Sequence, residues 1–455
     1  MHSLPVLLAT LAQAIGPAPS AAAPSAAAVR DEDAGAVGGA PLVVLAAKAL
    51  TCAEDPGDPQ AIDSAALLVL DGRIAFAGPA RDLRVPAGAL VRDVGDGWLM
   101  PGMIDLHSHI AGSTDWGTQV YLTNPGPRVS CCVVPDNALL RRGLAGGVTT
   151  ILFIPGSATN VGGQGVLLRT GFEHFEELLL RDPGSLKLAQ AGNPERWALG
   201  VSRSFMNWNI RNTFRRGLAY AAAWELYDRG AGPRPERNLQ FDVFRELYAK
   251  RIQVSTHTQL YQVVLATLTM MRDEFDLDVY IDHGTFDGYR AAALAEQRGV
   301  PAILGPRMIA YSVDAWIPGR APYRFSMDTD GRIEGVAAKY REGGHTEIGF
   351  NTDAIDLLLL PPDQRPGSTT TEELSLQAAM AVRYGLGNDD LEAVRGLTIV
   401  PARAAGLQDR LGSLEPGKDA DFLVITGDPA DPRTHVREVW LEGERVYDAA
   451  AERRW

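Results

Sequence analysis

Two histidines one residue apart, His107 and His109, are the residues of this sequence whose type and spacing most directly indicate chemistry. They end the apolar run W-L-M-P-G-M-I-D-L, which is typical of a buried strand, in a chain of 455 residues with only 8 histidines. Side chains two apart on a strand point to the same face. Neutral imidazoles are ligands that Zn²⁺ and similar divalent ions prefer. Taken alone, the pair leaves a metal site and two hydrogen-bonded structural histidines equally open.

Other polar side chains end or directly follow further apolar segments along the chain: Lys187 in L-K-L-A-Q, His257 in I-Q-V-S-T-H, His283 in V-Y-I-D-H, and Asp353 in E-I-G-F-N-T-D. Each alone has an ordinary explanation, such as a hydrogen-bonded histidine, a buried lysine in a salt bridge, or an aspartate that caps a helix. In a parallel β/α barrel, however, the strands' carboxyl ends meet on one face, where catalytic residues lie. Their order along the chain therefore favours one shared metal centre.

The elements that must position these residues alternate between short apolar strands and helical patterns from 101 to 399. This alternation predicts an α/β fold, most simply a (β/α)8 TIM barrel. Residues 41–100 and 400–449 instead consist of strands and turns, with hairpin signals at Asp71-Gly72 and Glu442-Gly443. We expect both chain ends to form one small composite β-sandwich, with the barrel inserted between its halves.

Residues 1–40 form a leader or a disordered tail, rich in Ala, Pro and Ser. A short apolar stretch followed by small residues resembles a secretory signal peptide, but no Lys or Arg precedes it. Cytoplasmic and exported locations therefore both stay open. No stretch of about 20 residues is apolar throughout, so we expect no membrane span.

The charge balance excludes some partners. The net charge is -13, with 43 Lys and Arg spread along the chain and no basic block, so we expect no nucleic-acid binding. A hydrophobic share of 46% is ordinary for a globular protein, so a small-molecule substrate and homo-oligomer formation both stay open. Three cysteines are too few for a disulfide framework, and a bridge between the adjacent Cys131 and Cys132 would be badly strained.

Several motifs together resemble the amidohydrolase superfamily: M-P-G-M-I-D-L-H-S-H, G-G-V-T-T, D-H-G-T, G-F-N-T-D-A, P-A-R-A-A-G-L and L-G-S-L-E-P-G-K-D-A-D-F-L-V-I. The stretch L-K-L-A-Q-A-G-N-P-E-R also resembles the imidazolonepropionase-like and prolidase-like branches. The resemblance covers about residues 41 to 449. It implies a metal-dependent hydrolase with a (β/α)8 barrel and a composite β-sandwich.

The resemblance also implies roles for the matching residues. His107 and His109 would bind a buried α-metal, and His257 and His283 a more exposed β-metal. Asp353 would be an α-metal ligand that also shuttles protons.

Lys187 matches the position where many superfamily members carry a carboxylated lysine that bridges two metals. An ammonium group would repel two cations, whereas its carbamate offers two anionic oxygens. The resemblance therefore implies two divalent ions, with zinc the first choice, or one ion if Lys187 is not carboxylated. Mn or Fe fits these ligands too.

The implied reaction is hydrolysis of a C–N bond other than a peptide bond, in an amide, a cyclic amide or a dipeptide-like substrate. A metal-activated hydroxide would attack, with Asp353 as the general acid and base. A mononuclear-metal deaminase or related ring-opening enzyme is an alternative. Related deaminases carry a glutamate shortly after the fifth-strand histidine, whereas the first acid after His257 is Asp273. A non-catalytic scaffold is a second alternative, although such relatives have lost ligands and this chain retains all six.

Substrate-binding residues are less clearly indicated. Gln164 in N-V-G-G-Q-G, Arg203 in a basic stretch, and Tyr261, four residues after His257, could each contact a substrate. Each also has a structural explanation: an incidental side chain in a glycine-rich loop, a solvated helix face, and aromatic packing, respectively.

Overall fold

The computed structural model describes residues 40–112, 121–190, 193–196, 201–305, 335–355 and 371–452. All described elements belong to one unit, residues 39–455, in which contacts cluster. The leader expected at 1–40 lies outside the described residues, except for residue 40. Among the described helices, none combines the length and the apolar character that crossing a membrane requires.

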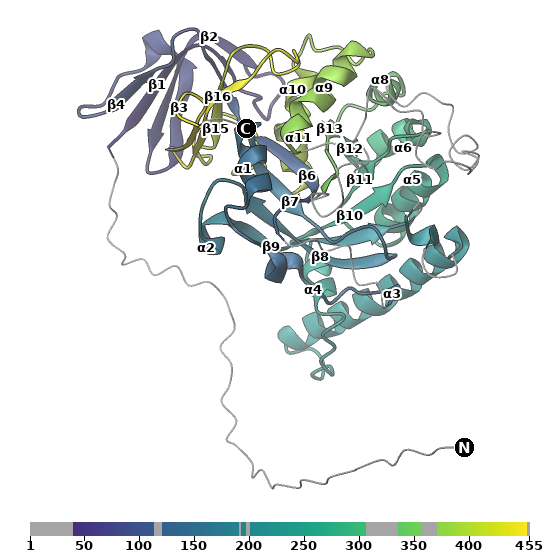
Figure 1. The fold of residues 1–455 in the computed structure, drawn as a ribbon. Coiled ribbons are helices and arrows are strands. Elements are labelled where there is room, and N and C mark those ends of the chain that lie inside the picture. The colour runs from purple at the N-terminus through teal and green to yellow at the C-terminus, as the bar shows by residue number, and fades with distance from the viewer. Residues whose placement is uncertain are drawn as a thin grey trace, which may run out of the picture. The chain divides into compact units, whose positions relative to one another are not determined.

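A nine-stranded sheet forms the centre of the middle region (Figure 1). Its strands, in spatial order, are β13 (Ile348–Phe350), β12 (Ala302–Leu304), β11 (Val279–His283), β10 (Gln253–Thr258), β9 (Leu179–Ala189), β8 (Val161–Arg169), β7 (Val148–Phe153), β6 (Met103–His109) and β14 (Ala354–Ile355). Only residues 351–353 separate β13 from β14, and β14 pairs in parallel with β6. The sheet therefore closes nearly into the expected barrel.

The barrel differs from the expected all-parallel pattern at one strand. β8 runs antiparallel to both β7 and β9. Residues 154–160, which join β7 to β8, are fewer than the dozen or so that a parallel crossover needs. The connection from β8 to β9 holds only the one-turn helix α2 (Phe175–Leu178). The repeated strand–helix unit is thus interrupted here, although the strand count still places Lys187 on the fourth strand.

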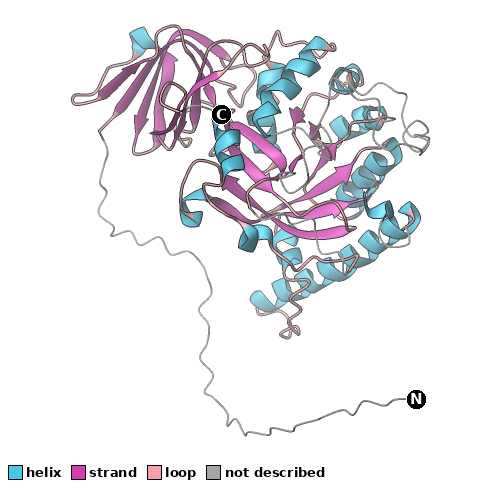
Figure 2. Ribbon diagram, viewed as in Figure 1, coloured by secondary structure: helices cyan, strands magenta, loops and turns pink. Residues whose placement is uncertain are grey.

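Helices lie around the outside of the barrel sheet (Figure 2). They include α1 (Ala138–Ala145), α3 (Arg203–Asp228), α4 (Val243–Tyr248), α5 (Tyr261–Thr267), α6 (Ala292–Gln297), α8 (Val336–Glu342), α9 (Leu374–Arg383), α10 (Glu392–Arg395) and α11 (Ile399–Ala404). A side-chain cap starts two of them: the Asn137 side chain accepts from two amides of α1, and Ser202 accepts from one amide of α3. Such caps satisfy amides that have no partner within the helix.

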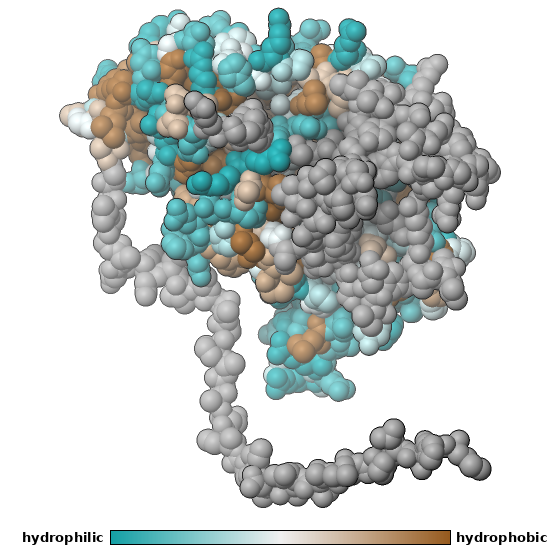
Figure 3. All heavy atoms as spheres, viewed as in Figure 1, coloured by the Kyte–Doolittle hydropathy of each residue, from teal (hydrophilic) through white to brown (hydrophobic). Residues whose placement is uncertain are grey.

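A second sheet joins the two chain ends. Its order is β17 (Glu444–Asp448), β16 (Val436–Leu441), β15 (Phe422–Ile425), β5 (Trp98–Pro101), β1 (Leu42–Leu50), β2 (Ala61–Leu70) and β3 (Arg73–Pro79), and β4 (Leu90–Asp93) also pairs with β1. The antiparallel pairing of β15 with β5 connects the two halves. In the view of Figure 3, apolar residues interrupt the hydrophilic surface over this sheet.

Both predicted hairpin turns are present. The turn at Asp71-Gly72 joins β2 to β3, and the turn at Glu442-Gly443 joins β16 to β17, with positive φ at all four residues. Two successive residues with positive φ are typical of the tight turns that match the twist of paired strands. The domain boundaries near 100 and 400 stay a prediction, because contacts group residues 39–455 as one unit.

A buried arginine ties the barrel to the composite sheet. Arg169 at the end of β8 donates to Asp421 at 2.8 Å and to Asp419 at 2.7 Å, just before β15. All three side chains are almost completely buried. A buried guanidinium without partners would destabilise the fold, and the two carboxylates compensate its charge. This contact links the third barrel strand to the C-terminal half of the second sheet.

Candidate metal centre

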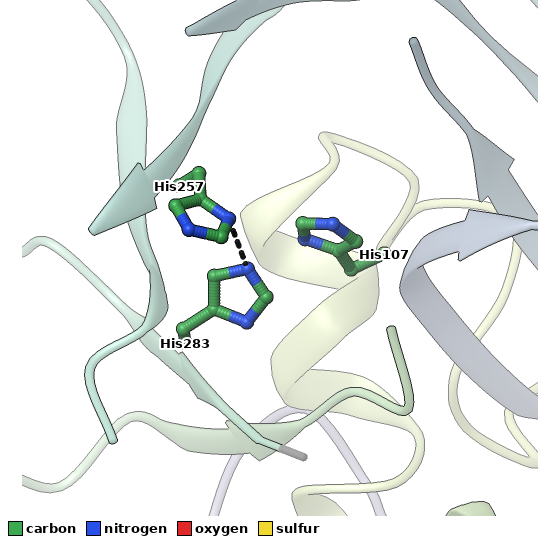
Figure 4. Close-up of side chains that lie close together, drawn as sticks. All are labelled: His107, His257 and His283. Carbon is green, nitrogen blue, oxygen red and sulfur yellow. Dashed lines mark hydrogen bonds between the residues drawn. The ribbon is translucent and has the colours of Figure 1, made fainter. Parts of the chain in front are cut away.

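The side chains predicted as metal ligands converge where barrel strands end. They are His107 and His109 on β6, Lys187 on β9, His257 on β10, His283 on β11, and Asp353 between β13 and β14. The four histidines and the lysine are buried, whereas about a third (34%) of the Asp353 side chain is exposed. Figure 4 shows three of the imidazoles facing one another, from strands far apart in the sequence. Asp353 therefore forms the side of this cluster that reaches solvent.

The possible ligand atoms form two overlapping groups. One group contains His107, His109 and Asp353, the other contains His107, His257 and His283, and the ligand atoms within each group lie within 4.8 Å of one another. The Asp353 carboxylate lies 3.2 Å from His107 Nε2 and 3.4 Å from His109 Nε2. His107 thus belongs to both groups, whereas the predicted sets assign it only to the α-metal, and the ligand sets stay a prediction.

Hydrogen bonds orient three of the rings in the same way. In each, Nδ1 faces a buried acceptor, so that Nδ1–H donates and the Nε2 lone pair stays available as a ligand. The acceptors are the Asp282 carboxylate for His107 (2.6 Å), the Ile154 carbonyl for His109 (2.8 Å) and the Gly305 carbonyl for His283 (2.7 Å). The rings are thus held with their ligand atoms directed into the cluster.

His257 presents its other nitrogen. Its Nδ1 lies 2.8 Å from His283 Nε2 and 3.0 Å from the Ser157 hydroxyl. Imidazole nitrogens directed at one small space cannot all be satisfied by hydrogen bonds to each other, because two facing lone pairs repel. A divalent cation satisfies several of them together. The donor set therefore fits a metal centre.

Lys187 lies beside His107, the histidine that both ligand groups share. Its Nζ is 3.3 Å from His107 Nε2 and 3.8 Å from the Asp282 carboxylate. Burial lowers the pKa of Lys187 to about 8, although Asp282 and Asp353 oppose the shift. A lowered pKa increases the share of neutral amine, which is the form that reacts with CO2. The position and the chemistry are both compatible with the predicted carbamate.

Burial also keeps two imidazoles neutral. It lowers the pKa of His257 well below the usual value, and it lowers the pKa of His283 to about 4, with nearby His107 adding to the shift. Burial alone would raise the pKa of Asp353, but the neighbouring histidines outweigh it and hold that pKa well below its usual range. Neutral imidazoles and an ionised carboxylate are the protonation states that bind a metal.

Two buried carboxylates were not predicted as functional residues. Asp282 accepts from His107 Nδ1, and its other oxygen accepts from the Asn351 amide at 3.0 Å. Asp105 accepts from the backbone amides of His107 at 3.1 Å and of Thr352 at 3.3 Å. The sequence did contain a signal for these two residues, since each is a charged residue inside an apolar run. A carboxylate in such a run is expected to be buried, and a buried carboxylate needs partners. Both residues hold the strand ends that carry the ligands.

The structure gives Gln164 a structural partner. Its amide group donates to the carbonyls of Pro125 at 2.9 Å and of Gly126 at 3.1 Å, and the side chain is buried in β8. These bonds fasten the loop that contains Pro125 and Gly126 to the barrel. They occupy the donors that a substrate carbonyl would use, so the predicted contact gains no support from this geometry.

Arg203 and Tyr261 also have local partners. Arg203, at the start of α3, donates twice to the Glu195 carboxylate, at 2.8 and 3.4 Å. The guanidinium of Arg290 lies 4.5 Å from the centre of the Tyr261 ring. The ion pair and the cation–π contact each account for the side chain's position, and the predicted substrate roles stay predictions.

Comparison with known proteins shows which proteins this chain resembles. A model of the amidohydrolase family matches residues 327–447, which include Asp353. The imidazolonepropionase of Sphingopyxis alaskensis is 27% identical over 394 residues, which cover 81% of this chain and 88% of that protein. The crystal structure of an amidohydrolase from Thermotoga maritima has a TM-score of 0.74 at 25% identity, and the match covers 90% of this chain and 100% of that one. The chain is therefore similar to members of the amidohydrolase superfamily.

A second solved structure is similar in fold at lower identity. The crystal structure of a Xaa-Pro dipeptidase with bound methionine is 16% identical, with a TM-score of 0.53, over 90% of this chain and 100% of that one. At this identity the likeness concerns the fold alone. The residues that the family model matches include Asp353, whereas the four histidines and Lys187 precede them.

Proposed function

We propose that this chain is a metal-dependent hydrolase that cleaves a C–N bond, other than a peptide bond, in a small molecule. The observation that carries the proposal is the convergence of two ligand groups on His107, with the ionised, partly exposed Asp353 beside it. Similarity to members of the amidohydrolase superfamily supports it. The barrel is proposed to be of the (β/α)8 type, with residues 101–399 as the catalytic domain and both chain ends forming a β-sandwich.

The proposed cofactor is a pair of divalent metal ions, with zinc the first choice. His107, His109 and Asp353 would hold one ion and His257 and His283 the other, with Lys187 between them as a carbamate. When bound, such ions polarise a carbonyl and lower the pKa of water. Without the carbamate, a single ion is expected, because an ammonium at Lys187 repels a second cation.

Asp353 is proposed to move the proton. The neighbouring histidines hold its pKa well below the usual range, so it is ionised and can accept a proton from the attacking water. Its partial exposure lets the same carboxyl reach the departing nitrogen, which must be protonated to leave. The buried histidines, in contrast, are held in place by their Nδ1 hydrogen bonds.

Ring deamination receives less support. The first acid after His257 is Asp273, and its carboxylate pairs with Arg298 at 2.7 Å on the surface. It is therefore engaged away from the strand ends, where a ring nitrogen would need protonation. The scaffold alternative is opposed by the presence of all six predicted ligands, five of which are buried.

Metal analysis followed by a substrate screen tests the proposal. We expect the purified full chain to contain up to two divalent ions and to hydrolyse members of a panel of cyclic amides, N-acyl amino acids and dipeptides. Metal removal should abolish hydrolysis, and metal readdition should restore it. Ammonia release from nucleobases without amide hydrolysis would favour the deaminase. A metal-free preparation that no ion activates would favour the scaffold.

A further inference from the structure

A pair of adjacent thiols lies close to the metal-binding strand β6 but outside the metal centre. Cys131 and Cys132 end the one-turn helix η2 (Val129–Cys132), and their Sγ atoms are 3.8 Å apart. Cys131 is exposed and Cys132 is partly buried, so a reagent can reach the pair. Cys52, in contrast, is buried, and burial raises its pKa to about 11. The proposed function uses none of these thiols.

The geometry disfavours a disulfide between the two residues. The only cis peptide bond among the described residues is Asp182–Pro183, so Cys131 and Cys132 are joined by a trans peptide. Their Cα atoms are then about 3.8 Å apart, whereas unstrained disulfides need roughly 4.4 to 6.8 Å. The two sulfurs would also have to approach from 3.8 Å to about 2.05 Å.

The same sulfur separation suits two bonds to one soft atom. Two thiolates on a tetrahedral centre with bonds of about 2.3 Å lie roughly 3.8 Å apart, and pyramidal trivalent arsenic, whose S–As–S angle is smaller, needs them slightly closer. Zinc, however, takes four ligands, and the two ligand groups found among the described residues include neither cysteine. A trivalent arsenic centre needs only two thiolates when its third bond goes to an organic group. The pair therefore matches the arsenic centre better than a zinc ion.

We propose that Cys131 and Cys132 form a dithiol site for trivalent arsenicals of the class R–As=O, and that its occupation inhibits the hydrolase. In the reaction two S–H bonds and the As=O bond break, and two S–As bonds form. The two protons leave with the oxygen as one molecule of water, and nothing is oxidised or reduced. Cys131 gives up its weak hydrogen bond to the Arg128 carbonyl at 3.2 Å.

The inhibition follows from how η2 is attached to the metal-binding strand. The Val134 amide donates to the Ala111 carbonyl at 2.8 Å. Gly112 lies so close to the Cys132 carbonyl that a Cβ at this position would be 1.8 Å from that oxygen. Gly112 is three residues after His109. Closing the arsenical ring draws the two sulfurs slightly together, and the resulting shift of the Cys132 backbone is therefore transmitted to the segment that directly follows His107 and His109.

Phenylarsine oxide is the probe, because it binds paired thiols and not imidazoles or carboxylates. The full chain is titrated, and mass spectrometry counts adducts while a thiol reagent counts the free cysteines. We expect one adduct per chain with loss of two reactive thiols. C131S and C132S should each bind about a hundredfold more weakly, because the second S–As bond is intramolecular only in the pair. C52S is the matched control and should bind like the natural chain.

The activity assay tests the coupling. Phenylarsine oxide should inhibit the natural chain and C52S, and a dithiol should reverse the inhibition, whereas C131S/C132S should keep full activity in its presence. Wild-type affinity in C131S, or ready formation of a Cys131–Cys132 disulfide with diamide, overturns the dithiol site. Stoichiometric binding without inhibition overturns the coupling to β6. The binding experiments need no turnover, so failure of the proposed hydrolase function is distinguishable from failure of this site.

Discussion

The predicted metal ligands and the predicted substrate contacts differ in what holds them in place. The histidines at the ends of β6, β10 and β11 point into one cluster, and their orientation follows from strand alternation and barrel closure. Gln164, Arg203 and Tyr261 instead make local contacts, with loop carbonyls, with Glu195 and with Arg290. The comparison teaches that strand ends which converge on one cluster fix the direction of their side chains, whereas nearby groups compete for an isolated polar side chain, whether it lies on a strand, as Gln164 does, or on a helix.

The largest effect is expected from His107→Ala, because His107 belongs to both ligand groups. The variant should lose nearly all bound metal and all measurable hydrolysis, and metal analysis with an activity assay checks this. His435→Ala is the matched control, since His435 is an exposed histidine whose ring faces only the Arg433 carbonyl. Retention of two ions per chain in His107→Ala would show that the two groups do not share this ligand.

Asp353→Asn is expected to cause the next largest loss. The variant keeps the shape of the side chain but cannot accept the proton, so kcat should fall by about 10²–10⁴-fold. The fall should exceed any loss of bound metal, which is measured on the same preparation. An unchanged kcat at full metal content would exclude Asp353 as the proton-transfer group. It would also weaken the comparison between the predicted metal ligands and the predicted substrate contacts.

Asp282→Asn tests the support behind the ligand set. Asparagine cannot offer the same anionic acceptor to His107 Nδ1, so metal affinity should fall by about 10–100-fold. Titration of the metal-free variant against a chelating dye measures the affinity without any need for turnover. Asp273→Asn, which removes a surface ion pair with Arg298, serves as the control and should leave affinity unchanged. Equal affinities in the two variants would show that Asp282 does not support the metal ligands.

Gln164→Ala should have the smallest effect on chemistry. Because Gln164 fastens the loop carbonyls of Pro125 and Gly126, its loss should lower the free energy of unfolding by about 1–3 kcal/mol. KM should stay within the error of the assay if the side chain is only structural. A raised KM with unchanged stability would support the predicted contact between Gln164 and the substrate. Gln164 would then be a residue of the functional site, like the histidines.

Much of the fold followed from pattern alone. The hairpins at Asp71-Gly72 and Glu442-Gly443 could be predicted because the turn needs residues that tolerate positive φ. The antiparallel β8 could not be predicted with equal ease, because a strand's apolar pattern is the same in either direction. Only the short link at 154–160 indicated a reversal, since a parallel crossover needs more chain.

The sequence by itself determined which side chains could bind metal, because residue type and the period of two along a strand place His107 and His109 on one face. Only the tertiary structure decided which nitrogen each ring presents and which groups hold it there. Asp282 lies 175 residues from His107 along the chain, and the Ile154 and Gly305 carbonyls reach the other rings from different strand ends. Such contacts depend on barrel closure, which brings distant strand ends together, and a local pattern carries no information about that closure.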